Sequence, residues 1–257
     1  MGRRKKASSA KVSAPVQTAI VRAVRRANPQ EVKFASSWNS QMVANAQYGV
    51  AFNSFVAADN NNLIPEIPQG FGVGQRGGDK INPKRLVVDV WVTATNLANN
   101  LDFVARLFML HSRKVKDPTL VGALNMNTLL DYGQGQKPFE GYTNDLSMPV
   151  NKQEFTIISD RLITMDKTYG FNPAVSNGYS SSAQGQSQGL IHHYRVTIKC
   201  PKVLHYNGDA AIYPDGFAPF FNCGYAQPSR VNNVDSPDLL ITALQVQWSS
   251  TLYYTDA

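Results

Sequence analysis

Two short motifs contain residue types that could do chemistry. Residues 72–78, with Arg76 among them, have the glycine spacing of a loop that cradles phosphate with backbone N–H groups. Such a loop requires a helix after it, whereas the residues from Lys80 onward alternate like a strand. A turn that leads into a strand therefore explains these glycines better than a nucleotide site does.

The neighbours His192 and His193 are the residue types of a metal pair. Adjacent residues of a strand point to opposite faces, so we expect His192 inside, His193 outside and no metal site. Two cysteines cannot form a disulfide framework or a four-cysteine site, and no Gly-x-Ser-x-Gly nucleophile motif is present. We therefore expect neither enzyme activity nor a cofactor.

Positive charge is concentrated at the N-terminus. The chain has a net charge of +7 over 257 residues, but residues 1–33 alone contain nine basic residues and one acidic residue, Glu31. The remaining residues contain 16 basic and 17 acidic side chains. The basic residues of this arm are Arg3, Arg4, Lys5, Lys6, Lys11, Arg22, Arg25, Arg26 and Lys33. A neutral body with a cationic arm indicates a polyanionic partner, and we assign these nine residues to nucleic-acid binding.

The cluster of Arg3, Arg4, Lys5 and Lys6 is typical of a nuclear import signal or a nucleic-acid patch. A mitochondrial presequence is the alternative for this arm, because it too is rich in arginine and poor in acidic residues. The polar residues 7–11 do not form the apolar core of a secretory signal. The longest uncharged stretch, 34–58, is rich in Ser, Asn and Gln, so we expect no membrane segment.

The pattern changes from helix to strand early in the chain. Residues 1–14 show no periodicity and are expected to be disordered, whereas 16–27 predict a short amphipathic helix with Arg22, Arg25 and Arg26 on its polar face. That helix either lies on the body as an ordinary surface helix or turns its arginines to nucleic acid. Alternation then predicts strands at 48–53, 86–93, 192–199 and 240–254, and dense apolar runs predict strands at 103–111 and 155–163. We expect the strands at 103–111 and 155–163 to be covered on both faces.

Long loops separate these strands, at about 57–80, 112–150, 168–189 and 201–237. Only 120–130 predicts a second short helix. Many strands without alternating helices predict an all-β fold, and loops of this length favour a jelly-roll β-sandwich of about eight strands over an immunoglobulin sandwich. We expect an arm at 1–33 and one jelly-roll domain at 34–257. Aromatic residues in the loops are expected to form subunit interfaces, namely Tyr132, Phe139, Tyr142 and the residues 217–221.

Taken together, the arm, the strand pattern and several motifs resemble the capsid proteins of circular single-stranded DNA viruses that encode their own replication initiator. Four segments carry the resemblance. They are Gln75-Arg76-Gly77-Gly78-Asp79-Lys80-Ile81 before a strand, Pro149-Val150-Asn151, Asp160-Arg161 within a strand, and Tyr253-Tyr254-Thr255-Asp256 near the end. The resemblance covers most of the chain. The arm is shorter and less rich in arginine than in circoviruses proper.

The resemblance implies a self-assembling protein of an icosahedral T=1 shell, with about 60 copies whose arms neutralise on the order of 500 phosphates of single-stranded DNA. It also implies localisation in the virion and, during assembly, in the host nucleus, reached through an import receptor. Three alternatives remain open. They are the coat protein of a small single-stranded RNA virus or satellite, a cellular nucleic-acid-binding β-domain, and a carbohydrate-binding jelly roll or hydrolase.

One arginine in the glycine-rich turn and two aromatic residues near the arm are further candidates for binding or structural roles. We assign Arg76 a structural or inter-subunit role, with phosphate binding as the alternative, because its glycine neighbours let the guanidinium approach a backbone or a carboxylate. Phe34 and Trp38 lie near the arm and could stack on unpaired bases, although such residues are more often part of a core.

Overall fold

The structure is a computed structural model that describes residue 16 and residues 31–44, 62–94, 103–124, 126–165, 191–226 and 242–257. By its internal contacts the chain divides into Met1–Val32 and Lys33–Ala257, and all strands among the described residues lie in the second unit. The helix expected at 16–27 lies outside the described residues except for Val16, which is helical and exposed. The division into an arm at 1–33 and a body at 34–257 stays a prediction.

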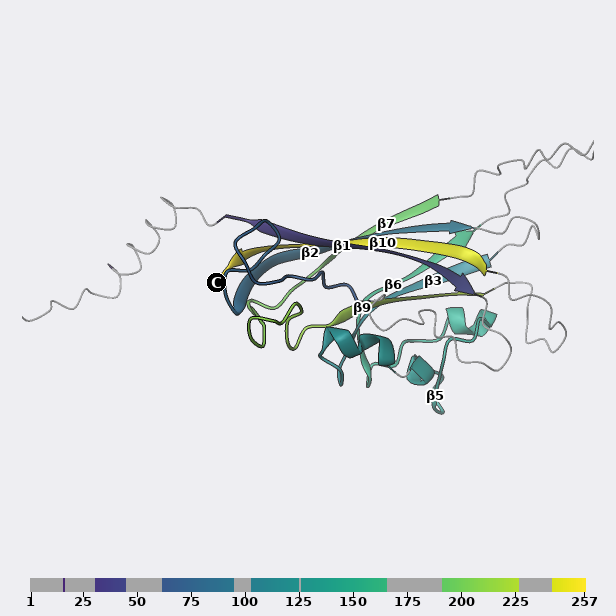
Figure 1. Cartoon of the computed structure of the whole chain (residues 1–257). Coiled ribbons are helices and arrows are strands. Elements are labelled where there is room, and N and C mark those ends of the chain that lie inside the picture. The colour runs from purple at the N-terminus through teal and green to yellow at the C-terminus, as the bar shows by residue number, and fades with distance from the viewer. Residues whose placement is uncertain are drawn as a thin grey trace, which may run out of the picture. The chain divides into compact units, whose positions relative to one another are not determined.

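Two antiparallel sheets form the body (Figure 1). The first sheet has the order β1 (Lys33–Ala44), β10 (Thr242–Asp256), β2 (Lys80–Ala94) and β7 (Ile191–Ile198), and β8 (Leu204–His205) pairs with the start of β2. The second sheet has the order β6 (Phe155–Met165), β3 (Phe103–Ser112) and β9 (Pro219–Ala226). A small hairpin pairs β4 (Leu130–Asp131) with β5 (Gln136–Lys137).

The strand order is that of a jelly roll. In this fold eight strands form two sheets of four, and the first and last strands are neighbours. The seven long strands occupy seven of the eight places, with β1 beside β10, and the place that remains is the one after β1. The strand expected at 48–53 lies outside the described residues. The expected all-β fold of two packed antiparallel sheets is confirmed.

The core between the sheets follows from alternation along β2 and β10. On β10 the alternating residues Val246, Trp248, Leu252 and Tyr254 are buried. The ring centroids of Trp248 and of Phe221 on β9 lie 5.3 Å apart. On β2 the inward side chains are Leu86, Val88, Val90 and Val92, all buried. The expected strands at 86–93, 103–111, 155–163 and 192–199 are present, and the expected strand at 240–254 is present from Thr242, where the described residues begin.

The second sheet is also covered on its outer face, by residues 113–154 (Figure 1). This segment contains the 3-10 helices η1 (Pro118–Ala123), η2 (Met126–Thr128) and η3 (Thr143–Leu146), so the short helix expected at 120–130 consists of separate 3-10 turns. Phe139 packs edge-on against Phe108 of β3, with ring centroids 6.0 Å apart. Both faces of β3 are therefore buried, as its continuous apolar run predicts.

Three expectations about the strands and loops are wrong, and one strand was missed. Strand β6 is not covered on both faces, because it lies at the edge of the second sheet and most of its side chains are partly or fully exposed. The loop expected at 201–237 contains a strand, β9, whose residues are all buried. Phe139 and the phenylalanines of 217–221 are core residues rather than exposed interface residues, although Tyr132 is exposed. Strand β1 was not among the expected strands.

Gly224 of β9 gives a direct test of how residues 113–154 pack on the sheet. A Cβ atom at this position would lie 2.5 Å from two ring atoms of Phe139, which is itself buried. We expect Gly224→Ala to lower the free energy of unfolding by about 1–3 kcal/mol, the usual effect of overpacking. Chemical denaturation measures the loss. The control is Gly78→Ala, since a Cβ there meets nothing within 4 Å. Equal stability of the two variants would contradict the packing described here.

Candidate functional site

Eight of the nine arm cations lie outside the described residues, and Lys33 is the exception. It is the first residue of β1, its side chain is 14% exposed, and its ammonium lies 2.8 Å from Oδ2 of Asp256. The ammonium also donates to the carbonyl of Gln75, and the other Asp256 oxygen accepts from the N–H of Gly77. Lys33 is thus ion-paired within the body, at the point where the arm joins β1.

Arg76 lies at the same end of the body and is wholly buried. Its Nη1 donates to the carbonyl of Gly78 at 2.5 Å, and Nη2 donates to the carbonyls of Gly208 and Ala211 at 2.8 and 2.9 Å. The guanidinium also lies 4.5 Å from the ring centroid of Tyr206. These contacts hold residues 62–79 against residues 199–218. A side chain with no exposed surface favours the structural role over phosphate binding, and an inter-subunit role stays a prediction.

A second buried arginine, Arg106 of β3, was missed by the sequence analysis. It forms a two-pronged ion pair with Asp160 of β6, with N–O distances of 2.9 and 2.6 Å. Its Nη1 donates to the carbonyls of Asp145 and Met148 in the segment that covers the sheet. Arg106 and Asp160 are 54 residues apart, so no local spacing could have indicated the pair.

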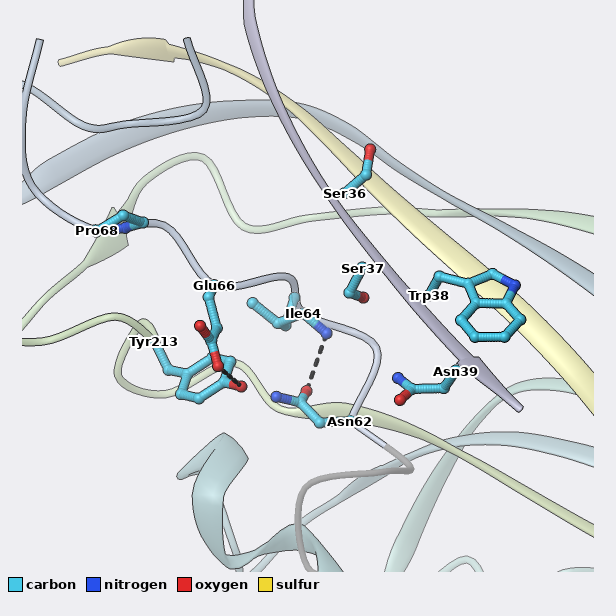
Figure 2. Close-up of a pocket in the computed structure, with 9 residues that line it drawn as sticks. All are labelled: Ser36, Ser37, Trp38, Asn39, Asn62, Ile64, Glu66, Pro68 and Tyr213. Carbon is cyan, nitrogen blue, oxygen red and sulfur yellow. Dashed lines mark hydrogen bonds between the residues drawn. The ribbon is translucent and has the colours of Figure 1, made fainter. Parts of the chain in front are cut away.

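A cavity of about 560 Å³ lies between β1 and the segment 62–68 (Figure 2). Figure 2 shows Ser37 and Asn39 on the side of β1 that faces this segment and Trp38 on the other side. Tyr213 donates to Glu66, and the hydroxyl of Ser37 bonds to that of Ser250. The hydroxyl of Ser36 likewise bonds to a hydroxyl, that of Thr251. Among the described residues that line the cavity, neither serine is therefore paired with an imidazole or a carboxylate that could activate it as a nucleophile.

The other chemistry-bearing residues are dispersed over the body. His192 is half-buried and His193 is exposed, as the alternation predicts, and the imidazole of His193 lies 2.8 Å from Asp89. Both cysteines are free, and burial raises the pKa of the Cys200 thiol to about 11. Among the residues that the structure describes, no group of three or more His, Cys, Asp or Glu side chains gathers as a metal site. In the same residues no helix has the length and apolar character needed to cross a bilayer.

Comparison with known proteins leaves the family open. No family model matches the chain, and no curated protein matches it. A solved structure of the Macrobrachium rosenbergii nodavirus is similar at a TM-score of 0.31 and 9% identity, over 100% of this chain and 60% of the other. The chain thus spans less than two thirds of that protein's length. A TM-score of this size does not establish a shared fold, so the fold assignment rests on the strand order.

The Lys33–Asp256 pair predicts a pH dependence of stability. Burial acts to raise the pKa of Asp256, but the hydrogen bonds from Lys33 and Gly77 and the Lys33 charge outweigh it and hold this pKa below its usual 3.8. Because the pKa of Asp256 is lower in the folded state, its charged carboxylate stabilises the fold at a pH above 3.8. This stabilisation is lost as the pH falls from 3.8 through the lowered pKa. We expect Asp256→Asn to lower Tm at neutral pH and to lose less further stability on acidification. Lys33→Met and the double variant of Lys33→Met with Asp256→Asn complete a double-mutant cycle. If the losses of Tm of the two single variants add up in the double variant, the two side chains are not paired.

Arg76 predicts a loss of stability without a loss of nucleic-acid binding. Arg76→Ala leaves the carbonyls of Gly78, Gly208 and Ala211 without their donor, which costs about 1–3 kcal/mol. We expect a lower Tm and, if the chain assembles as the resemblance implies, a lower yield of particles with unchanged nucleic acid per particle. The matched control is Arg113→Ala, at an exposed arginine. Normal assembly with reduced nucleic acid would instead place Arg76 in the binding surface.

Proposed function

We propose that this protein is a viral capsid protein that assembles into a closed shell and packages nucleic acid through its basic arm. The observation that carries the proposal is the combination of a jelly-roll strand order with a terminal segment of net charge +8. Rigid sandwiches can form a wall without a metal or a disulfide. A dense terminal charge binds phosphates without reading their sequence.

The division of charge between arm and body supports this proposal over a cellular nucleic-acid-binding β-domain. Such a domain usually carries its basic patch on the fold itself. Here the residues from 34 onward contain 16 basic and 17 acidic side chains, whereas residues 1–33 contain nine and one. A neutral body is compatible with close packing of identical copies, since it limits repulsion between them.

The finer assignment is a circovirus-like shell of about 60 subunits around single-stranded DNA, in which the arms neutralise on the order of 500 phosphates. The motifs around Arg76, Asp160 and Tyr254 support it through their resemblance to that family. The cluster of Arg3, Arg4, Lys5 and Lys6 then acts as the nuclear import signal before assembly. The coat protein of a small single-stranded RNA virus is the second candidate, favoured by the same fold and arm.

Exposed apolar side chains indicate where copies could meet. Phe71 is 100% exposed at the tip of the turn 68–76, and Val73 and Leu120 are also exposed. The turn is held by backbone hydrogen bonds from Gly70 to Arg76 and from Arg76 to Pro68. Together with Tyr132, these residues replace Phe139 and 217–221 as the proposed interface residues. The proposed protein needs no catalytic residue and no cofactor.

Deleting residues 2–28 tests the proposal. We expect particles with an intact β fold, seen by circular dichroism and electron microscopy, but with little packaged nucleic acid, because the deletion removes eight of the nine arm cations. The ratio of nucleic-acid to protein absorbance of purified particles measures the loss. A full-length variant with the same eight residues changed to Gln should behave alike, whereas Lys114→Gln with Lys152→Gln in the body should not. An unchanged ratio after deletion, or a monomer under all conditions, would contradict the proposal.

A further inference from the structure

The two sheets differ in what covers their outer faces. Residues 113–154 cover the second sheet, but in the described parts of the chain no element lies over the outer face of the first sheet (Figure 1). The strand registers place its outward residues in four rows across β1, β10, β2 and β7. The rows are Phe34–Tyr253–Arg85, Ser36–Thr251–Val87–Thr197, Trp38–Ser249–Asp89–Arg195 and Ser40–Gln247–Trp91–His193. None of these residues is buried, and together we call them the open face.

The open face carries exposed aromatic rings. The side chains of Phe34 and Trp38 are 49% and 64% exposed. Phe34 contacts the ring of Tyr253 at 6.4 Å between centroids, and Trp91 stacks on His193 at 5.0 Å. The expectation that Phe34 and Trp38 belong to a core is therefore wrong, because the alternation of β1 directs both outward. Their backbone positions lie about 13 Å apart along the strand, so one flexible strand can contact both.

Cations outnumber carboxylates on this face. Arg85 lies with its guanidinium 4.5 Å from the ring centroid of Tyr253, and a β-bulge places exposed Lys84 beside it. Exposed Lys199 continues the outward alternation of β7. The single carboxylate of the rows, Asp89, is paired with Arg195 at 2.7 and 3.1 Å. Lys84, Arg85 and Lys199 therefore supply net positive charge at the end of the sheet where β1 begins.

Hydroxyl and amide side chains fill most of the remaining positions, such as Ser36, Thr251, Ser249 and Gln247. A surface that a second copy buries is usually more apolar at its centre. Stacking rings beside cations and uncharged hydrogen-bonding groups are instead the composition of a surface that binds single strands. The arm supports the same occupant, since the chain from the cationic segment enters this sheet at Lys33.

We propose that the open face binds single-stranded nucleic acid, with bases stacked on Phe34 and Trp38 and phosphates at Lys84, Arg85 and Lys199. This inference rests on the proposed function and adds a second binding surface to it, on the body rather than on the arm. Unpaired bases are required, because paired bases do not expose their rings to a flat protein surface. The surface reads no sequence, since every base has a face that can stack.

The test is binding of a fluorescein-labelled oligothymidylate of about 20 nucleotides by the full chain, followed by anisotropy over a series of salt concentrations. We expect the double variant Phe34→Ala, Trp38→Ala to bind about tenfold more weakly at every salt concentration, with an unchanged salt dependence. We expect Lys84→Gln with Arg85→Gln to reduce the slope of log affinity against log salt by about 0.7 for each lost phosphate contact. Tryptophan fluorescence should be quenched on binding, and Trp38→Phe should remove most of the quenching.

Matched controls separate the open face from other exposed residues. Leu162→Ala removes an exposed apolar side chain on the second sheet, and Lys152→Gln removes an exposed cation elsewhere, so both should bind like the unchanged chain. Circular dichroism confirms that each variant is folded. Unchanged affinity and quenching in the aromatic variants would overturn the inference while leaving the arm proposal intact. A loss of assembly with unchanged oligonucleotide affinity would also overturn it, since it would assign the face to a second copy.

Discussion

Buried guanidinium groups that bind loop carbonyls hold this structure together. The described connections 62–79, 113–154 and 199–218 contain little regular structure, and a buried carbonyl there without a donor would be costly. Arg106 donates from its planar guanidinium to two carbonyls of the segment 113–154, and Arg76 donates to two carbonyls of the segment 199–218. Asp160 balances the charge of Arg106, and Asp79 lies 3.4 Å from Arg76. Each arginine thus fixes a loop layer without a metal or a disulfide.

The position of Arg106 determines which surface remains open. Its side chain leaves the outer face of β3 and binds Asp145 and Met148, so residues 113–154 are held over the second sheet. Phe139 then packs on Phe108 and against Gly224, and the second sheet becomes a central layer. The first sheet has no comparable buried cation on its outer face. Its outward side chains are therefore hydroxyls, amides, rings and exposed cations, which tolerate water.

Alternation in the sequence predicted the strands whose two faces differ in polarity. On β2, β7 and β10 apolar residues alternate with polar ones, and the burial of Trp248 and Leu252 follows from this pattern. Strand β1 was not predicted because polar residues, such as Ser37 and Asn39, also lie on its inward side, so polarity does not alternate. It can carry them because it lies at the edge of the sheet. Strand β9 was not predicted because both of its faces are buried, so apolar and polar residues do not alternate along it. Its residues Pro219 and Gly224 are also typical of loops. The Arg106–Asp160 pair depends on the tertiary fold, which no local pattern encodes.

The ion pair at the start of β1 fixes Lys33, the last basic residue of the arm, to the body. Because Asp256 binds the last arm cation, Lys33, that charge is paired within the fold, and its assignment to nucleic-acid binding stays a prediction. The same pair joins the first residue of β1 to the last residue of β10, Asp256, whose side chain also accepts a hydrogen bond from the N–H of Gly77. Beside this pair, Arg85 of β2 is held against the ring of Tyr253 of β10, so a cation of the body has a fixed place next to an aromatic ring. If the open face binds single strands as proposed, a phosphate there meets a positioned charge beside rings on which bases can stack.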